Sequence, residues 1–268
     1  MWSKLSQRLT DPLFYRKRLR QLLRPVFPPR PPKPVMLDEL VAIDGAWLVA
    51  IAHPDDELFA SGLLCELSER GRQVHIVCLT KGEGGVTGGE SREELGRVRE
   101  GELRNSAAEL GASSVSFLGH RDPLGQEHRT YAPEVPVSKL AAQIREQLEI
   151  HRPAVILTHG SGGEYWHPAH LLVREAVLHA AGGEHHLLTL HAWQKNHPLP
   201  GLLNRDDPAD LVLDVTEHRE QRLAAFRAHR SQLEYFAKRG GGSLEGFVDR
   251  TAKEAYRHFP MMRQSNLG

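Results

Sequence analysis

The chain has 268 residues, with 34 basic and 34 acidic side chains and 40% hydrophobic residues. This length and hydrophobic content exclude a wholly disordered chain and predict one large domain, with or without an appendage. The formal net charge of zero argues against a protein that coats nucleic acid, so we expect no nucleic acid among its partners. The cysteines Cys65 and Cys78 are too few for a disulfide framework and favour a reducing, cytoplasmic compartment.

The N-terminal part differs from the rest of the chain. Residues 1–34 carry many Arg and Lys with Asp11 as their lone acid, and end in the proline-rich run PPRPPKP. We predict a basic arm and stiff spacer over 1–36, followed by one catalytic domain over 37–268. Two interpretations of the arm stay open: a surface helix that contacts anionic lipid or a partner, or a segment that packs on its own domain or moves freely. Only the first would place the protein at a membrane.

Short apolar runs rich in Val, Ile and Leu begin at Ala46 and mostly lack polar alternation, which is typical of strands covered on both faces. Segments with helical periodicity separate them. This alternation predicts an α/β fold with a mainly parallel sheet flanked by helices, whose ligands bind beyond the carboxyl ends of the strands. We expect strands at 46–52, 73–80, 114–119, 154–160, 187–193 and 211–215, and helices at 57–71, 90–111, 137–151, 167–183 and 216–232.

The first strand ends in a polar cluster that contains His53, Asp55, Asp56 and Glu57. One acid could cap the following helix, but capping needs a single oxygen, not three carboxylates and an imidazole. If His53 and Asp56 point the same way, they offer a nitrogen and an oxygen ligand to one metal ion, and Asp55 faces a bound water. Glu57 would then orient the ligands or cap the helix.

The fourth strand ends at Thr158, and a glycine-rich loop then delivers His167 and His170 at the start of another helix. Residues three apart on a helix are neighbours, so both imidazoles can enter one site with different tasks. With His53 and Asp56, His170 completes two histidines and one carboxylate with an open position, which is typical of catalytic zinc. The HxxH spacing alone would be weak evidence.

These motifs resemble the LmbE-like, or PIG-L, family of zinc-dependent N-acetylglucosaminyl deacetylases over about residues 45–235. The matching stretches are AHPDDE (52–57), TKGEGG (80–85), LGHRD (118–122), HGSGGEYWHPAH (159–170) and AFRAHRSQ (225–232). The resemblance implies a Rossmann-like, three-layer α/β/α fold. It also implies that His53, Asp56 and His170 hold the metal, that Asp55 is the general base, and that His167 is an acid or oxyanion stabiliser.

The expected reaction is hydrolysis of an N-acetyl group on a GlcNAc-containing small molecule or a glycolipid headgroup. A divalent ion activates water and polarises the amide, Asp55 takes the water proton, and His167 as an acid protonates the leaving amine. Zinc (Zn2+) is the expected metal and iron (Fe2+) the alternative. The sequence leaves open whether the protein forms a homo-oligomer.

Further polar and aromatic residues are candidates for substrate binding: Lys81, Glu83, Arg99, Asp122, Tyr165 and Trp166. For Arg99 and Asp122 the alternative is a surface ion pair, and for Trp166 it is packing against the loop. Trp166 and Ala169 stand where family members commonly have Gly and Asp, which leaves the orientation and pKa of His167 open. His229 and Gln232 either border the site or serve packing.

Three other functions remain as alternatives. An amidase acting on a bulkier thiol-sugar conjugate would use the same site. A sugar-binding relative without turnover is suggested by Ala169. A nucleotide-binding protein is disfavoured, because KGEGGVTGG lacks the GxxxxGK[ST] spacing and the first strand carries no GxGxxG.

Overall fold

The computed structural model describes residues 32–85, 89–125 and 130–261. The chain divides into Met1–Pro32 and a compact unit from Lys33 to Gly268. The predicted arm and its contacts fall on residues 1–31 and lie outside the described residues. Among the helices that are described, none is long and apolar enough to cross a membrane.

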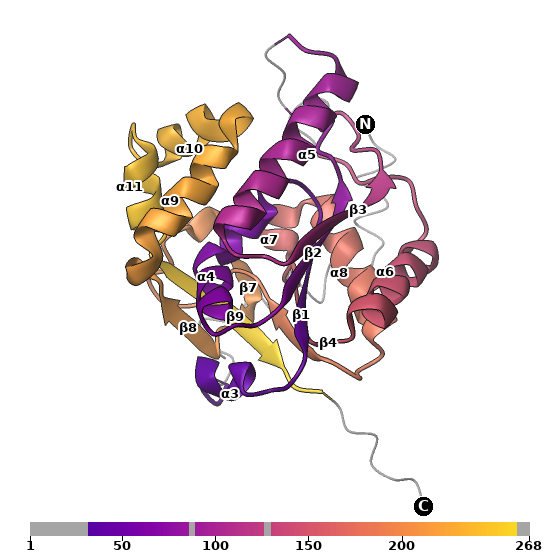
Figure 1. Ribbon diagram of the computed structural model, residues 1–268, viewed down its shortest axis with the longest axis vertical. Coiled ribbons are helices and arrows are strands. Elements are labelled where there is room, and N and C mark those ends of the chain that lie inside the picture. Colours follow the sequence, from indigo (N-terminus) through magenta and orange to yellow (C-terminus); the bar gives the residue numbers. More distant parts are fainter. Residues whose placement is uncertain (1–31, 86–88, 126–129, 262–268) are drawn as a thin grey trace, which may run out of the picture. The chain divides into compact units, whose positions relative to one another are not determined.

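A seven-stranded sheet with the order β3-β2-β1-β4-β5-β9-β8 forms the centre of the compact unit (Figure 1). Strands β1 to β5 are parallel, and β9 pairs antiparallel with β5 and β8. The predicted mainly parallel sheet is therefore confirmed. The strands are β1 Ala46–Ile51, β2 Val74–Thr80, β3 Ser114–His120, β4 Pro153–Thr158, β5 His186–Thr189, β8 Leu211–Asp214 and β9 Lys253–Phe259, and a separate pair holds β6 Ala192–Trp193 and β7 Asn204–Pro208.

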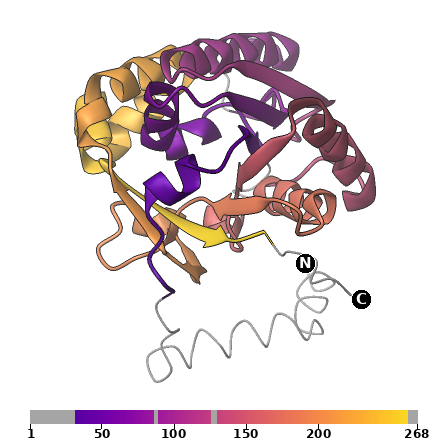
Figure 2. The same ribbon diagram turned by 60° about the horizontal axis from the view of Figure 1, so that its bottom comes forward.

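Helices cover both faces of the sheet (Figure 2). Side chains of a strand alternate between faces, so Trp47, Val49 and Ile51 of β1 pack in one cluster with α4, α5 and α9, while Leu48 and Ala50 pack with α6 and α8. The helices are α3 Leu37–Val41, α4 Ser61–Glu69, α5 Arg92–Glu109, α6 Val137–His151, α7 Gly163–Trp166, α8 Pro168–Ala181, α9 Arg219–Ala228, α10 Leu233–Arg239 and α11 Leu244–Arg250. Short 3-10 turns are η1 Asp56–Ala60, η2 Pro200–Leu202, η3 Thr216–His218 and η4 Arg230–Gln232.

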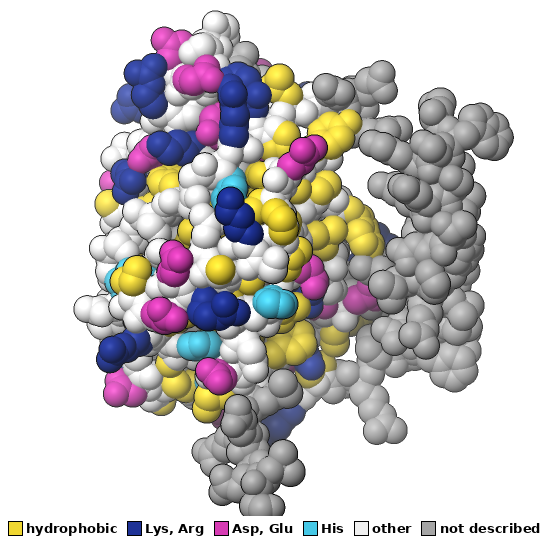
Figure 3. Space-filling view, turned by 90° about the vertical axis from the view of Figure 1, so that its right-hand side faces the viewer, with side chains coloured by type: hydrophobic (Ala, Val, Ile, Leu, Met, Phe, Trp, Pro, Cys, Tyr) yellow, Lys and Arg dark blue, Asp and Glu magenta, His cyan; other side chains and the backbone are white. Residues whose placement is uncertain are grey.

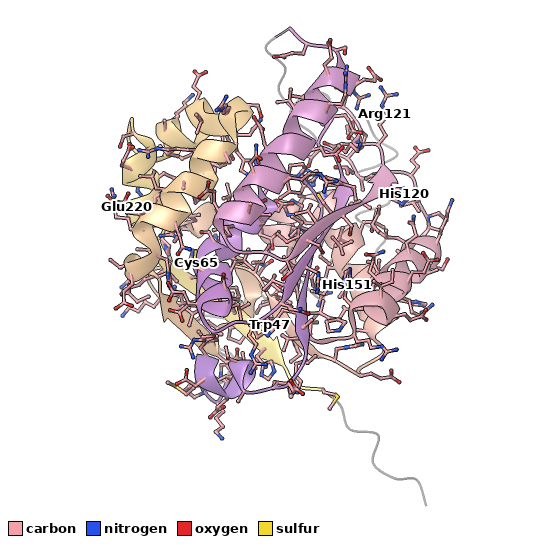
Figure 4. All side chains as sticks on the ribbon, viewed as in Figure 1. Trp47, Cys65, His120, Arg121, His151 and Glu220 are labelled. Atoms are coloured by element: carbon pink, nitrogen blue, oxygen red, sulfur yellow. The ribbon has the colours of Figure 1, made fainter. Side chains whose placement is uncertain are left out.

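Local sequence signals explain several helix boundaries. Ser91 and Glu94 form a reciprocal capping box at the start of α5, and α8 has Pro168 at its first position and Gly182 with a φ of 57° just after its end. The free cysteines are buried, and Cys65 of α4 lies in the same cluster as Trp47 of β1 (Figure 4). On the face seen in Figure 3, acidic and basic side chains are interspersed, in keeping with the zero formal net charge.

Several features of the fold differ from the prediction, since the sequence indicated neither β7 nor α3, α10 and α11. The expected strand 187–193 is two strands, because His191 has a φ of 47° and turns the chain away from the sheet after Thr189. Strand β9 was not predicted, because its sequence KEAYRHF mixes charged and apolar residues and shows no clear apolar face. Within β9, buried Glu254 accepts hydrogen bonds from the backbone N–H groups of Gly62 and Leu63, and so caps the first turn of α4.

The order of the strands determines where a site can form. The chain winds from β1 to β3 in one direction and then continues from β4 to β5 on the other side of β1. The two histidine-bearing motifs follow β1 and β4, the neighbouring strands on either side of this reversal. Ligand sites of open parallel sheets lie at this point, beyond the carboxyl ends of the strands.

Candidate metal centre and active-site cavity

An open cavity of about 250 Å³ lies beyond the carboxyl ends of β1 to β4. It is lined by residues that follow all four strands, together with side chains from α10 and α11. The predicted site residues among its lining are His53, Asp55, Asp56, Arg99, Asp122, Tyr165 and His167. The cavity thus joins segments that are more than a hundred residues apart in sequence.

The three predicted metal ligands come together at the base of this cavity. Asp56 Oδ2 lies 3.3 Å from His53 Nδ1, and Asp56 Oδ1 lies 3.4 Å from His170 Nε2. The ring centroids of His53 and His170 are 5.3 Å apart. Ligand atoms bound tetrahedrally at the usual zinc distances are separated by about 3.3 Å, which matches the distance from Asp56 to each imidazole. The three residues are divided between two close groups of ligand atoms, and His170 belongs to both of them.

The outer nitrogens of both histidines support the same interpretation. His53 Nε2 lies 3.5 Å from Asp122 Oδ1, and His170 Nδ1 hydrogen-bonds Glu164 Oε2 at 2.5 Å. Imidazoles that bind metals usually carry such a carboxylate on the other nitrogen. In the described part of the chain, the buried Nε2 of His170 makes no hydrogen bond. A buried acceptor without a partner is costly unless an ion or another donor uses it, so the residues present fit a divalent cation.

Electrostatics favour a positive charge at this position. Burial lowers the pKa of His53, but the carboxylates of Asp122 and Asp56 outweigh it and raise that pKa to about 10. Burial raises the pKa of Asp56, yet His170, His53 and His159 bring it well below its usual range. The pocket therefore stabilises a positive charge between two carboxylates. A metal ion that displaced the proton of His53 would supply that charge.

Two further histidines lie within reach of the same ligands. His167 forms a close group with His53 and His170, and His159 forms one with Asp56 and His170. The sequence analysis assigned no role to His159, although it is the first polar side chain after β4. Its Nε2 accepts a hydrogen bond from Ala52 N–H at 3.0 Å and is thereby occupied. His159 is consequently a support of the site and not a ligand in this arrangement.

Asp55 sits at the cavity wall in a strained conformation, with a φ of 98° that a residue other than Gly rarely adopts. Its N–H donates to Glu57 Oε2 at 2.9 Å, which holds the turn in place. Glu57 Oε1 in turn accepts from Ser106 Oγ and from His229 Nε2, each at 2.6 Å. Glu57 is fully buried behind the cavity and holds Asp55, whereas the sequence predicted that it orients the metal ligands or caps the helix. His229 packs against Glu57 without lining the cavity.

Arg99 lines the cavity and is fixed on Asp55, so it is not a surface ion pair. It is 4% exposed, and its Nη2 lies 3.0 Å from Asp55 Oδ2. The same guanidinium donates to the carbonyls of Gly82 and Pro54. Burial raises the pKa of Asp55 to about 6, and Arg99 acts in the opposite direction. A carboxylate with such a pKa is well suited to accept a proton near neutral pH.

His167 lies in the cavity, where its surroundings disfavour the imidazolium that the sequence predicts. Burial, followed by the neighbouring His53 and His170, lowers the pKa of His167 to about 3. Its Nδ1 accepts a hydrogen bond from Ala169 N–H at 3.3 Å. The neutral ring therefore carries its proton on Nε2, which makes it a hydrogen-bond donor. Of the two roles implied by the family resemblance, this favours oxyanion stabilisation over acid catalysis.

Lys81 and Glu83, which the sequence predicts to contact the substrate, pair with other residues of the chain. Lys81 Nζ pairs with Glu100 Oε2 on α5 at 2.5 Å, and Glu83 Oε2 accepts from Asp122 N–H at 3.2 Å. Neither side chain lines the cavity. Asp122 does line it, but its two oxygens face His53 and the N–H of Gly84. Asp122 is thus placed to orient His53, one of the proposed metal ligands.

The two aromatic residues of the loop before α8 have different positions. Tyr165 lines the cavity, and its ring lies 5.5 Å from the rings of His167 and His170. Trp166 is not among the lining residues and is 51% exposed, so its predicted substrate contact is not borne out by the cavity. Its φ of 68° lies in the left-handed region that favours glycine, the residue common at this place in the family it resembles.

The C-terminal helices form one wall of the cavity, and the sequence did not predict this wall. Gln232, which was left open, does border the site. The helix α10 adds further side chains, and the Arg239 guanidinium stacks over the Tyr235 ring at 4.6 Å. No motif signals these residues, because their position depends on how α10 and α11 pack against α9. The additional lining residues from this part are Tyr235, Phe236, Arg239 and Phe247.

Comparison with known proteins agrees with this geometry. The family model PIG-L, GlcNAc-PI de-N-acetylase, matches residues 48–181. The 1D-myo-inositol 2-acetamido-2-deoxy-alpha-D-glucopyranoside deacetylase of Mycolicibacterium vanbaalenii is 30% identical over 227 residues, covering 68% of this chain and 78% of that protein. The deacetylase 1 of the same name from Saccharopolyspora erythraea is 28% identical over 235 residues, covering 69% and 77%.

Solved structures share the fold. The N,N'-diacetylchitobiose deacetylase from Pyrococcus horikoshii has a TM-score of 0.57 at 18% identity, covering 95% of this chain and 98% of that one. GalB, a 4-carboxy-2-hydroxymuconate hydratase from Pseudomonas putida, has a TM-score of 0.55 at 19% identity, covering 84% and 100%. The same architecture thus occurs in enzymes with different names, and the fold alone does not decide the reaction. Since the family model spans the strands and loops that carry the metal motifs, the chain belongs to the PIG-L family.

Proposed function

We propose that the protein is a metal-dependent hydrolase that removes the N-acetyl group from a GlcNAc-containing small molecule. The observation that carries this proposal is the convergence of His53, Asp56 and His170 beside the half-buried carboxylate of Asp55. The named activities of the sequence relatives, deacetylases of an acetamido sugar joined to inositol, support the same substrate class.

His53, Asp56 and His170 would hold the divalent ion, with zinc as our preferred metal and Fe2+ as the alternative for two nitrogens and a carboxylate. When bound, such an ion lowers the pKa of a water molecule and polarises the amide carbonyl. Asp122 and Glu164 hold the outer nitrogens of the two histidines. The chain itself therefore contributes both the ligands and their orientation.

Asp55 is the proton acceptor in this proposal. Its carboxylate takes a proton from the attacking water while the water oxygen forms a bond to the acetyl carbon. The C–N bond then breaks, and the departing nitrogen must gain a proton because an amine cannot leave as an anion. The proton held by Asp55 supplies it, so acetate and a free amine are the products. Arg99 keeps the carboxylate in place throughout.

His167 acts as a hydrogen-bond donor to the carbonyl oxygen. Its neutral ring has Nδ1 occupied by Ala169 N–H, which leaves the Nε2 proton for the substrate. A fixed donor at a developing negative charge is among the largest contributions to acyl transfer. Ala169 lacks the carboxylate that would stabilise an imidazolium, which agrees with this role.

The described residues support an N-acetylated amino sugar as substrate and offer no argument for a lipid-linked one or for an oligomer. Tyr165, Tyr235 and Gln232 at the cavity mouth suit a sugar ring and its hydroxyls. The test is an acetate-release assay on a panel of N-acetylglucosamine conjugates, including glucosaminyl-inositol and chitobiose types. Release of a different acid from a bulkier amide would favour the amidase alternative. Binding without turnover on the whole panel, with metal present, would contradict the hydrolase.

We expect Tyr235→Ala to raise KM about 2–10-fold with little change in kcat. The ring lines the cavity from α10, and loss of one aromatic contact is worth about 0.5–1.5 kcal/mol. Lys81→Ala is the matched control, since Lys81 pairs with Glu100 outside the cavity. Steady-state kinetics of acetate release measure both. A higher KM for Lys81→Ala with an unchanged Tyr235→Ala would reverse the assignment of the binding wall.

We expect Arg99→Met to shift the acidic limb of the kcat/KM profile toward higher pH. Burial raises the pKa of Asp55 and Arg99 lowers it, so removal of the guanidinium raises that pKa further. A base works only when deprotonated, so activity on the acidic side falls. The control is Arg104→Met on the same helix, because exposed Arg104 pairs with half-buried Glu100, and this variant should leave the limb in place. If the acidic limb of the kcat/KM profile does not move in a folded Arg99→Met protein, the proposed effect of Arg99 on the pKa of Asp55 is refuted.

A further inference from the structure

Glu164 is a buried carboxylate that accepts four hydrogen bonds. Its Oε2 accepts from His159 Nδ1 at 2.9 Å and from His170 Nδ1 at 2.5 Å. Its Oε1 accepts from Gly160 N–H at 3.0 Å and from Asn204 Nδ2 at 3.1 Å. The side chain is 3% exposed and does not line the cavity, so it has no direct access to a substrate.

These contacts determine which nitrogen of each imidazole carries a proton. His159 Nε2 accepts from Ala52 N–H, so the proton of this ring is on Nδ1 and points at Glu164. His170 likewise directs Nδ1 at Glu164, which leaves its Nε2 as an electron-pair donor 3.4 Å from Asp56 Oδ1. The two rings stack at a centroid distance of 4.0 Å with an angle of 18° between their planes. One carboxylate oxygen therefore sets both tautomers and aligns the rings.

The loop that carries Glu164 is held by a second strand pair. Asn204 of β7 accepts the N–H groups of Gly162 and Glu164 on its Oδ1 and donates to the carbonyl of Leu190. A Cβ on Gly160 would lie 2.1 Å from Asn204 Nδ2, so only glycine permits this close approach. The scaffold thus fixes the carboxylate before any metal arrives.

The backbone of Glu164 is strained at this position. Its φ of 59° and ψ of −66° are outside the allowed regions for a residue with a Cβ. Strain of this kind persists where the surroundings over-determine it, and it is concentrated at functional sites. Ala169, next to His170, carries no carboxylate. Of the described residues, Glu164 is the one whose carboxylate contacts His170 Nδ1.

We propose that Glu164 is a positioning residue that fixes the tautomer and ring orientation of His170 for metal binding, with His159 sharing the same carboxylate. This inference rests on the proposed metal site and adds to it a residue that never contacts the substrate. It explains why a buried, strained acid occupies the loop, since only a carboxylate offers acceptors on both oxygens.

Glutamine cannot replace Glu164 without loss. If its amide oxygen faces the two imidazoles, its NH2 group meets the donors of Gly160 and Asn204. If the amide is flipped, its NH2 group meets the two Nδ1–H groups, and His170 must move its proton to Nε2 to accept. That tautomer has no electron pair on Nε2 for the metal.

The test compares Zn2+ affinity of the full chain in the wild type, Glu164→Gln and Asp207→Asn, measured by competition with a chromophoric chelator. Asp207 is the matched control, because this buried carboxylate accepts Ser161 N–H in the same loop, but no histidine. We expect the Kd of Glu164→Gln to rise about 10–100-fold and that of Asp207→Asn to stay near the wild type. Wild-type affinity in Glu164→Gln, or an equal loss in both variants, would overturn the inference and leave the metal site standing. Absence of Zn2+ binding by the wild type would overturn both.

A measurement on the wild type keeps the inference falsifiable if Glu164→Gln does not fold. Long-range 1H–15N spectra of the metal-free protein, with signals assigned through His159→Ala and His170→Ala, report the tautomer of each ring. We expect Nδ1 to be protonated and Nε2 unprotonated in both. The opposite tautomer for His170 would overturn the proposal, whatever reaction the enzyme catalyses.

Discussion

Replacement of Asp55 by Asn is expected to lower kcat for acetate release by about 10²–10⁴-fold, the usual contribution of a general base. The amide cannot take a proton from the attacking water, whereas the metal ligands are untouched. The fold should tolerate the change, because Asn is enriched in left-handed backbone conformations such as the φ of 98° at this position. The N–H bond to Glu57 is also retained.

The measurement is single-turnover acetate release together with the Zn2+ content of each protein. Asp44→Asn is the control, since Asp44 is an exposed carboxylate just before β1 that lies 4.0 Å from Arg72. Its kcat should equal that of the wild type. Full activity in Asp55→Asn would remove the assigned base, and loss of Zn2+ from that variant would mean that Asp55 supports the metal instead of the proton transfer.

The clustering of the proposed metal ligands and base could be predicted from the sequence because their geometry is local. His53, Asp55 and Asp56 follow one apolar strand within four residues, and His167 and His170 begin one helix. Parallel strands bring their carboxyl ends to one edge of the sheet, so two such motifs have to meet. The contact of Glu57 with the backbone of Asp55 did not follow from this reasoning, which assigned Glu57 to the metal ligands or to a helix cap.

The sequence does not determine the partners of side chains whose contacts come from elsewhere in the fold. Arg99 and Lys81 are both basic residues near the second strand, yet one is buried against Asp55 and the other pairs with Glu100 at the surface. Charge alone does not distinguish these outcomes. Glu164 escaped notice because its partner Asn204 lies 40 residues away on a strand that has no apolar pattern. The wall from α10 was missed because helix packing, and not a motif, places Tyr235.

Metal removal is expected to abolish acetate release, with kcat/KM reduced by about 10³-fold or more after chelation and recovered on addition of Zn2+. The basis is that a bound divalent ion supplies several kcal/mol of transition-state stabilisation, and about 1.4 kcal/mol corresponds to a factor of ten. Comparison of Zn2+ with Fe2+ in the restored enzyme would identify the better metal.

His170→Ala should also abolish acetate release, and added Zn2+ should not restore it. The substitution removes one of the three proposed ligands and leaves Asp56 and Glu164 without their shared imidazole. His186→Ala is the control: this residue lies on β5, stacks on His258 and does not line the cavity.

The midpoint of thermal unfolding supplies a readout independent of turnover, since a ligand at 100 times its Kd stabilises the native state by about 2.7 kcal/mol. Zn2+ should therefore raise the midpoint of the wild type and of His186→Ala, but not that of His170→Ala. An activity that survives chelation, with no change in midpoint on adding Zn2+, would contradict a metal-dependent enzyme and require a hydrolysis carried by Asp55 and His167 alone.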